Sequence, residues 1–269
     1  MASFIQDIRF ALRLLAKSPL ASLVAVLSLT LGIGSTTSVF SLVDALLLRP
    51  LPAVRDPDSL VAVAGVQAKT PDRLRRIAWA DYLDYAGQKG AVAALAAMAG
   101  LDLSLTHHGP AERLSGLAVS TNYFATLGLR PALGRLLAAG DEEAFVAVLG
   151  HDLWQRRFGG DPGVIGSVIQ LNGKGLTVVG IAPRGFAGTG LSTRQEVWMP
   201  LGVYSKVAAG VLASFTGSHD RQQEWLSVIG RLPAGVSLDQ AQGALDVVAS
   251  RLAASYPEAG GRGVRVLPL

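Results

Sequence analysis

The clearest hydropathy pattern in the chain is an uncharged, largely apolar segment near the N-terminus. No Asp, Glu, Lys or Arg lies between Lys17 and Asp44, and the 26 residues Ser18–Val43 are mostly Leu, Val, Ala, Gly and Ser. As a helix, this segment would extend about 39 Å, whereas the hydrocarbon core of a bilayer is about 30 Å thick. The pattern therefore predicts a transmembrane helix, which we place at residues 18–48.

A second pattern lies just before this segment. Apolar side chains recur at helical spacing, at Phe4, Ile5, Ile8, Leu12 and Leu15. Basic side chains occupy another face, at Arg9, Arg13 and Lys17. This arrangement predicts an interfacial amphipathic helix at residues 1–17 that lies on the lipid bilayer. Because basic residues favour the cytoplasmic side, we expect a cytoplasmic N-terminus and an extracytoplasmic main domain.

Two other interpretations of the N-terminal pattern stay open. In a cleaved signal peptide, Leu20–Gly34 would be the apolar core and Ser35–Ser38 would supply small residues for cleavage. However, there is no clear A-x-A site and the apolar run continues past these residues. Alternatively, the segment could be a buried helix of a soluble protein, although 26 uncharged residues exceed the usual length of such helices.

Residues 53–269 alternate between strand and helix patterns. We expect strands at Ser59–Val66, Gly100–Thr106, Ala111–Ser120, Ala144–Gly150, Val164–Leu171, Leu176–Ile181, Glu196–Leu201, Trp225–Leu232 and Gly263–Leu269. We expect helices at Ala78–Ala86, Ala91–Ala99, Asn122–Leu127, Asp152–Phe158 and Ser237–Tyr256, and an exposed loop at Ala209–Glu224. The irregular alternation favours an α+β domain with mixed or antiparallel sheets.

Local signals support several of these assignments. Residues His107–Pro110 and the pair Asn172–Gly173 have the composition of hairpin turns. Ser237 can cap the last long helix, and Gln240, three residues later, completes a capping box. These signals fix where strands reverse and where that helix begins.

Composition narrows the function classes. The formal net charge is only +4 and the basic residues are scattered; the pairs Arg75–Arg76 and Arg156–Arg157 are isolated. We therefore expect no nucleic-acid partner, because binding to phosphates needs clustered basic side chains. The absence of cysteine excludes disulfides, thiol nucleophiles and thiolate-bound metals.

A search for catalytic motifs gives no enzyme class. The chain has no Walker A sequence, no H-E-x-x-H and no G-x-S-x-G. The adjacent pair His107 and His108 is better interpreted as a polar turn than as a metal site, and neighbouring residues at Gly217–Asp220 cannot adopt triad geometry. We therefore predict no catalytic, cofactor-binding or metal-ligating residues, no cofactor and no enzymatic activity.

The remaining notable side chains have structural interpretations. The aromatic residues are expected to anchor the core or the interface between subdomains: Trp79, Tyr82, Tyr85, Trp154, Phe158, Trp198 and Trp225. Asp81 and Asp84 are expected to pair with Arg75 or Arg76 at the surface, where ion pairs contribute little to stability.

Nine stretches, in order, resemble MacB/FtsX-type ABC transporter permeases, in particular the N-terminal transmembrane helix and the MacB-like periplasmic core domain. They are Asp7–Lys17, Leu29–Pro52, Trp79–Tyr85, Ser120–Gly134, Leu153–Gly166, Leu171–Pro183, Val197–Leu201, Gly230–Leu245 and Val264–Leu269. The resemblance implies a two-lobed periplasmic domain at residues 53–269, anchored in the inner membrane. It also implies further permease transmembrane helices or chains as partners, and a separate cytoplasmic ATPase subunit.

The resemblance also implies a mode of action. ATP-driven motion would be coupled to the periplasmic domain for export or efflux, and the permease would contribute no catalytic residue. Since the sequence ends at Leu269, where the family continues into a second span, the chain would be a fragment of a permease or would assemble with other membrane chains. The alternative is a membrane-anchored extracytoplasmic binding or scaffold module without transport activity. A secreted enzyme is the third hypothesis, which the motif search disfavours.

Overall fold

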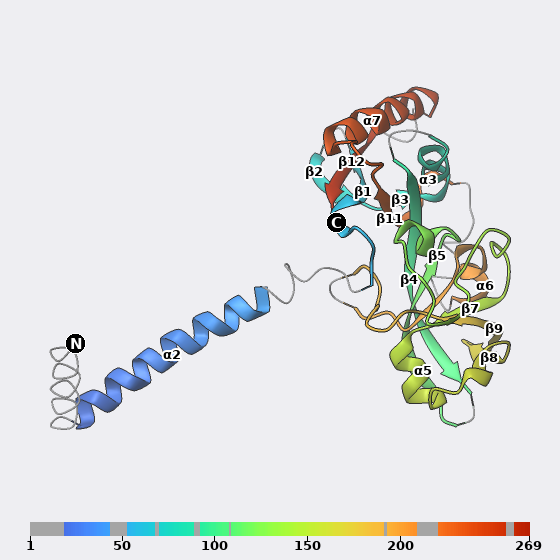
Figure 1. Cartoon of the computed structure of the whole chain (residues 1–269). Coiled ribbons are helices and arrows are strands. Elements are labelled where there is room, and N and C mark those ends of the chain that lie inside the picture. The colour runs from blue at the N-terminus through green and yellow to red at the C-terminus, as the bar shows by residue number, and fades with distance from the viewer. Residues whose placement is uncertain are drawn as a thin grey trace. The chain divides into compact units, whose positions relative to one another are not determined.

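The computed structural model describes residues 19–43, 53–67, 70–88, 92–107, 109–190, 193–208, 220–256 and 261–269. The chain divides into two compact units, Met1–Pro50 and Leu51–Leu269 (Figure 1). The amphipathic helix predicted at residues 1–17 lies outside the described residues, as does most of the loop predicted at Ala209–Glu224. The domain boundaries derived from the sequence stay predictions.

Helix α2 (Pro19–Val43) is the described part of the first unit and is unbroken over 25 residues. Several of its hydroxyl groups donate to carbonyl oxygens one turn earlier, for example Thr30 to Val26 at 2.7 Å and Ser38 to Gly34 at 2.8 Å. Among the residues that the structure describes, no helix has both the length and the apolar character required to cross a membrane. The span predicted at residues 18–48 is therefore not confirmed.

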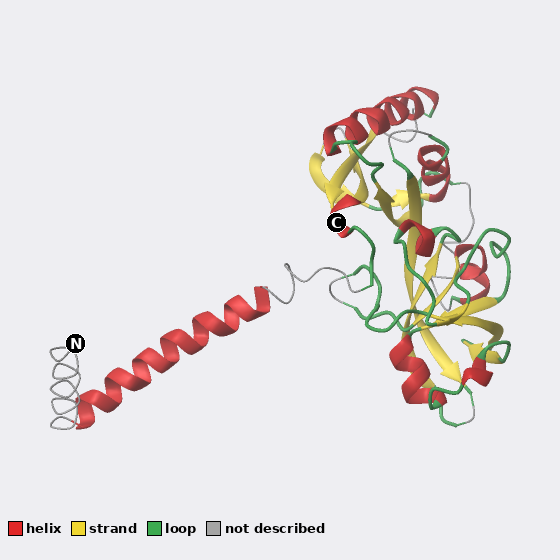
Figure 2. Ribbon diagram, viewed as in Figure 1, coloured by secondary structure: helices red, strands yellow, loops and turns green. Residues whose placement is uncertain are grey.

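The described strands of the second unit form one twelve-stranded sheet (Figure 2). Its main path runs β12-β1-β11-β4-β5-β10-β7-β9-β6, and β2, β3 and β8 pair at its sides. The strands are β1 (Leu60–Gln67), β2 (Thr70–Arg75), β3 (Ile77–Ala78), β4 (Ala94–Thr106), β5 (Glu112–Val119), β6 (Leu133–Gly134), β7 (Val146–Leu149), β8 (Val168–Leu171), β9 (Lys174–Ile181), β10 (Val197–Pro200), β11 (Glu224–Arg231) and β12 (Arg262–Pro268). Two pairs, β10 with β5 and β7 with β9, are parallel and the others are antiparallel. The predicted mixed α+β class is confirmed.

Helices pack against both ends of this sheet. They are α3 (Trp79–Ala86), α4 (Tyr123–Thr126), α5 (His151–Phe158), α6 (Tyr204–Val207) and α7 (Leu238–Ser255), with short 3-10 turns at Pro57–Ser59, Pro162–Val164 and Leu201–Val203. In Figure 1, α3 and α7 lie at the end that contains β12, β1 and β11, and α5 lies at the opposite end. The long strand β4 connects the two ends.

The core lies on both faces of the sheet. Successive residues of a strand point to opposite faces, and the two buried clusters separate accordingly. In β1, Leu60 belongs to one cluster and Val61 to the other; in β11, Ile229 and Val228 divide in the same way. Consecutive buried residues at Val228–Gly230 show that this part of β11 is covered on both faces.

Most of the local predictions are confirmed. Asn172 and Gly173 both have positive φ and join β8 to β9 through a two-residue turn, as expected for an Asn-Gly hairpin. Ser237 and Gln240 form the predicted capping box at the start of α7. Strands β4 and β5 pair as the predicted antiparallel hairpin, from Met98↔Val119 to Leu105↔Glu112.

One element was predicted wrongly. The alanine-rich run Ala91–Ala99 was expected to be a helix, but its residues from Ala94 onward begin strand β4. There the chain is paired on both sides, with Ala97 opposite Val228 of β11 and Ala99 opposite Ala118 of β5. Helix propensity is a weak preference, and the two neighbouring strands override it.

The segment that enters the domain is clamped by one arginine. The guanidinium group of Arg231 donates to the carbonyl oxygens of Arg55 (2.6 Å), Asp56 (3.1 Å) and Thr126 (2.6 Å), and to the hydroxyl of Ser59. These bonds fasten the residues before β1 to α4 and β11. Strand β12 pairs antiparallel with β1, so the last described strand lies beside the first.

Candidate functional site

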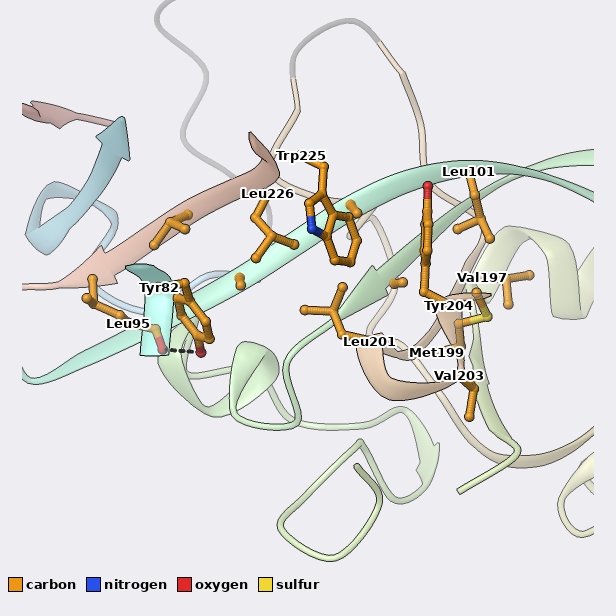
Figure 3. Close-up of a cluster of buried hydrophobic side chains, with 14 of the residues drawn as sticks. Tyr82, Leu95, Leu101, Val197, Met199, Leu201, Val203, Tyr204, Trp225 and Leu226 are labelled. Carbon is orange, nitrogen blue, oxygen red and sulfur yellow. Dashed lines mark hydrogen bonds between the residues drawn. The ribbon is translucent and has the colours of Figure 1, made fainter. Parts of the chain in front are cut away.

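A groove of about 460 Å³ lies where α3 faces the start of β4 and the end of β5. Its walls come from α3, from the residues around the start of β4 and the end of β5, from the loop before β7 and from the turn after β10. Three of its lining residues, Tyr82, Leu95 and Leu201, belong to one buried cluster (Figure 3). Ligand sites in proteins commonly have volumes of about 300–1,000 Å³, so the groove is the candidate functional site.

Helix α3 presents two different faces because of its spacing of apolar residues. Tyr82 and Tyr85 are each only 5% exposed and face the core. Trp79 and Leu83, four residues apart, both line the groove, and 46% of Leu83 is exposed. An exposed leucine beside a half-buried tryptophan gives the groove an apolar wall.

A chain of hydrogen bonds fixes the wall opposite α3. The hydroxyl of Ser120 accepts from the backbone N–H of Ala97 (3.0 Å) and donates to Asn122 Oδ1 (2.7 Å). Asn122 Nδ2 donates to the carbonyl oxygen of Leu95 at 2.8 Å, and Tyr82 donates to that oxygen at 3.3 Å (Figure 3). The polar groups of Ser120 and Asn122 are therefore largely engaged with the protein itself.

The loop before β7 brings two carboxylates, Glu142 and Glu143, to the edge of the groove. Arg135 forms a two-bond fork with Asp141, at 2.5 and 2.8 Å, and Asp141 also accepts from the N–H of Ala138 at 3.0 Å. On the other side Gly202 packs so closely on the carbonyl oxygen of Glu142 that a Cβ atom would not fit there. The backbone that carries the two carboxylates is thus held at Asp141 by the fork and at Glu142 by the close packing of Gly202.

The fork gives this loop a pH-dependent stability. The hydrogen bonds from Arg135 hold the pKa of Asp141 below its usual 3.8. Because the folded state favours the carboxylate, the stabilisation is complete above pH 3.8 and is lost as the pH falls through the lower folded-state pKa. We expect Asp141→Asn to reduce the free energy of unfolding by about 1.5 kcal/mol at pH 7. The difference should shrink below pH 3.8, as measured by thermal unfolding across pH; a constant difference would contradict this explanation.

On the far side of α3, six charged side chains form a compact ion cluster: Arg75, Asp81, Asp84, Arg221, Glu224 and Arg262. Arg221 binds Asp81 and also Asp84 (2.7 Å), while Arg262 binds Glu224 (3.1 Å) and Asp81 (3.4 Å). Arg75 binds Glu224 at 2.6 Å. The cluster has three positive and three negative charges, and it joins α3 to β2, β11, β12 and the residues just before β11.

The predicted partners of Asp81 and Asp84 were wrong. Neither carboxylate pairs with Arg75 or Arg76; Arg76 donates instead to the carbonyl oxygen of Trp225 at 2.9 Å. The side chain of Asp81 is only 11% exposed, so its pairs are not surface pairs. The cause is the fold, which brings Arg221 and Arg262 to α3 from positions more than 130 residues later.

The ion cluster also affects two aromatic rings. The guanidinium group of Arg221 stacks 4.0 Å from the ring centre of Tyr256, a favourable cation–π arrangement. Burial, and then the nearby carboxylates of Asp81 and Asp84, raise the pKa of Tyr85 far above its usual 10. Tyr85 therefore stays a neutral core residue at physiological pH.

The aromatic residues singled out in the sequence lie in or against the core. Tyr82, Tyr85, Trp198 and Trp225 are buried, and Trp79, Trp154 and Phe158 pack partly buried against the core. Of the histidines, His107 lies 5.0 Å from the ring of Phe158 and His151 lies 5.5 Å from that of Trp154. His108 and His219 lie outside the described residues. Within the described part of the chain, no three His, Asp or Glu side chains are grouped as metal ligands.

Comparison with known families shows to which protein family the chain belongs. The profile of the family described as "MacB-like periplasmic core domain" matches residues 22–248, most of the chain. The chain belongs to this family. It is therefore a MacB-like ABC transporter permease domain, as the sequence resemblance predicted. A comparison with curated proteins found no match.

Solved structures show the same MacB-like fold. The periplasmic region of MacB from Actinobacillus actinomycetemcomitans is 13% identical, with a TM-score of 0.56 over 81% of this chain and 92% of that chain. The extracellular domain of the ABC-type transporter YknZ from Gram-positive bacteria is 14% identical, with a TM-score of 0.54 over 76% of this chain and 98% of that chain. At such low identity these likenesses establish the fold of the MacB-like domain, and the groove has to be interpreted from its own residues.

Proposed function

We propose that this chain is a permease-type subunit, or part of one, of a MacB/FtsX-like ABC transporter. In this proposal a separate cytoplasmic ATPase drives motion of the extracytoplasmic domain for export or efflux. The observation that carries the proposal is the extent of the family match, which begins at residue 22 inside the uncharged segment and continues to residue 248. The match thus includes part of the segment that we propose as the anchor.

The proposed anchor is residues 18–48, preceded by an interfacial helix at residues 1–17 and followed by the extracytoplasmic domain at residues 53–269. Support comes from the exposed large apolar side chains of α2, which are 57–79% exposed at Leu20, Leu23, Val24, Val26, Leu27, Leu29, Leu31, Ile33 and Phe40. Exposed apolar area of this extent favours a lipid environment over water. We place the anchor in the inner membrane, with the N-terminus in the cytoplasm.

A coupling role also needs a stiff entry into the domain. The Arg231 clamp holds the residues before β1 through three hydrogen bonds and binds Thr126 of α4 through a fourth, and Arg55 N–H donates to the carbonyl oxygen of Leu127 at 3.2 Å. A displacement of the entering segment would therefore be transmitted to α4 and to the centre of the sheet. We propose further membrane helices, from this or other chains, as the partners that produce the displacement.

Membrane fractionation with protease protection in spheroplasts tests the anchor. We expect the chain in the membrane fraction, with residues 53–269 digested from outside and an N-terminal tag protected. The double variant Leu27→Lys/Leu31→Lys should move much of the chain to the soluble fraction, because each lysine costs about 3 kcal/mol at the centre of a span. The control Val247→Lys, at a 61% exposed position of α7, should leave fractionation unchanged. Release of the domain as an N-terminally processed protein would overturn the proposal.

The groove favours the alternative function, a membrane-anchored binding or scaffold module. The absence of cysteine allows a test with Leu83→Cys/Glu143→Cys, which places spin labels on two walls of the groove. For a driven permease, we expect ATP added to native membranes to change the distance between the labels. An unchanged distance, together with confirmed anchoring, would favour the scaffold.

A further inference from the structure

At the edge of the groove, the negative charge of one carboxylate is not paired with a cation. Glu142 contacts two neutral groups, the hydroxyl of Thr121 (3.3 Å) and the N–H of Gly140 (2.9 Å). Its neighbour Glu143 is paired with Lys206 at 2.8 Å. Among the described residues that line the groove there is no Lys or Arg. The groove is therefore a local acidic site in a chain whose formal net charge is +4.

The same groove is also lined by the apolar side chains of Trp79 and Leu83. A lysine or arginine side chain matches both features, because its methylene stem packs on apolar surface while its charged end reaches a carboxylate. The ring of Trp79 adds a favourable face for a cation. A neighbouring apolar side chain of the ligand would occupy the space next to Leu83 and Leu201.

The polar groups of the groove narrow the ligand class further. Ser120 and Asn122 are engaged with Ala97, Leu95 and each other, so few free donors or acceptors face the space. A sugar or a nucleotide needs many such groups, and an anion would meet the repulsion of Glu142. What remains is recognition by apolar contact and positive charge.

We propose that the groove binds a segment of a partner protein that presents a basic side chain next to an apolar one. The basic side chain extends along Trp79 to Glu142, and the apolar side chain lies against Leu83 and Leu201. This interaction goes beyond the proposed transport function, because it requires neither ATP hydrolysis nor motion of the anchor.

The test uses the full chain in nanodiscs and a fluorescent six-residue peptide of alternating leucine and arginine, with empty nanodiscs subtracted. We expect saturable binding by fluorescence anisotropy that weakens with salt, since the pairing is partly exposed. Glu142→Gln should weaken binding about fivefold, which corresponds to about 1 kcal/mol. The amide oxygen can still accept from Gly140 N–H, and the amide NH2 can donate to the hydroxyl of Thr121. Leu83→Ala should remove the apolar contact without changing the charge of the groove and should weaken binding as well.

A control variant, a control peptide and a small amine test whether binding is specific to Glu142 and to a basic peptide. The variant Asp102→Asn removes an exposed carboxylate of β4, which pairs with Arg113 of β5, and should bind the peptide like the unchanged chain. A peptide with glutamate in place of arginine should not bind. Equal binding by the Glu142→Gln variant, or binding of phenylpropylamine with no binding of the peptide, would overturn the proposal, the second result in favour of a small amine ligand.

Discussion

Replacing Asp81 by alanine is expected to lower the free energy of unfolding of the domain by about 3–5 kcal/mol. Its carboxylate binds both Arg221 and Arg262, and each of these arginines is only 17% exposed. Without Asp81 the ion cluster would hold three positive charges against two negative ones. Little water could reach the excess charge, so the loss greatly exceeds the value of an ordinary surface pair.

A matched control separates burial from charge. Asp102 also pairs with an arginine, Arg113 at 2.8 Å, but these side chains are 68% and 80% exposed. Asp102→Ala should therefore change stability by less than about 1 kcal/mol. Urea unfolding followed by tryptophan fluorescence is a suitable measurement, because all four tryptophans lie between residues 79 and 225. Similar losses for both variants would show that Asp81 acts as a surface pair, as the sequence had suggested.

The ion cluster also shows why sequence patterns could not reveal these contacts. Arg75 and Arg76 were the nearest cations to Asp81 along the chain, and local reasoning selected them. The actual partner Arg221 comes from the residues before β11, and Arg262 begins β12. Only the order of strands in the sheet brings them to α3, and a hydropathy pattern does not encode that order.

Where short-range chemistry decides the structure, prediction from sequence succeeded. Asn172–Gly173 fixes a turn through two backbone conformations, and Ser237 with Gln240 fixes a helix start through side chains three residues apart. The helix predicted at Ala91–Ala99 was wrong because β5 and β11, on either side of β4, decide the conformation of this segment. Alanine favours a helix in isolation, but packing against neighbouring strands overrides this weak preference in a central strand.

The groove could not be predicted from the sequence either. Its acidic edge depends on the Arg135–Asp141 fork and on the close approach of Gly202, and its apolar wall depends on which face α3 turns outward. From the sequence, Trp79 was interpreted as an anchor of the core or of the interface between subdomains, and neither Trp79 nor Leu83 was named as a site residue. Tyr82 and Tyr85 are buried in the core, whereas Leu83 stays exposed at the groove, which Tyr82 also lines.

The second large effect is expected at Trp198, which is fully buried in β10. Its ring stacks on Phe186 at 5.4 Å and meets the edge of Phe124 at 5.9 Å. Trp198→Ala would remove an aromatic ring between two paired strands that cannot easily close the space. We expect a loss of about 3–5 kcal/mol in the free energy of unfolding, measured by circular dichroism because the variant lacks one fluorophore.

The variant Trp198→Phe keeps an aromatic ring between Phe124 and Phe186. Its free energy of unfolding should fall clearly less than that of Trp198→Ala, which would identify the cavity as the cause of the larger loss. The same cluster has a mechanical role in our proposal, since Val54, in the segment held by Arg231, packs against it. If the cluster supports the entry of the chain, Trp198→Ala should also speed proteolysis near residues 53–59 at temperatures well below unfolding. Unchanged cleavage there, despite the loss of stability, would mean that the Arg231 clamp alone holds the entering segment.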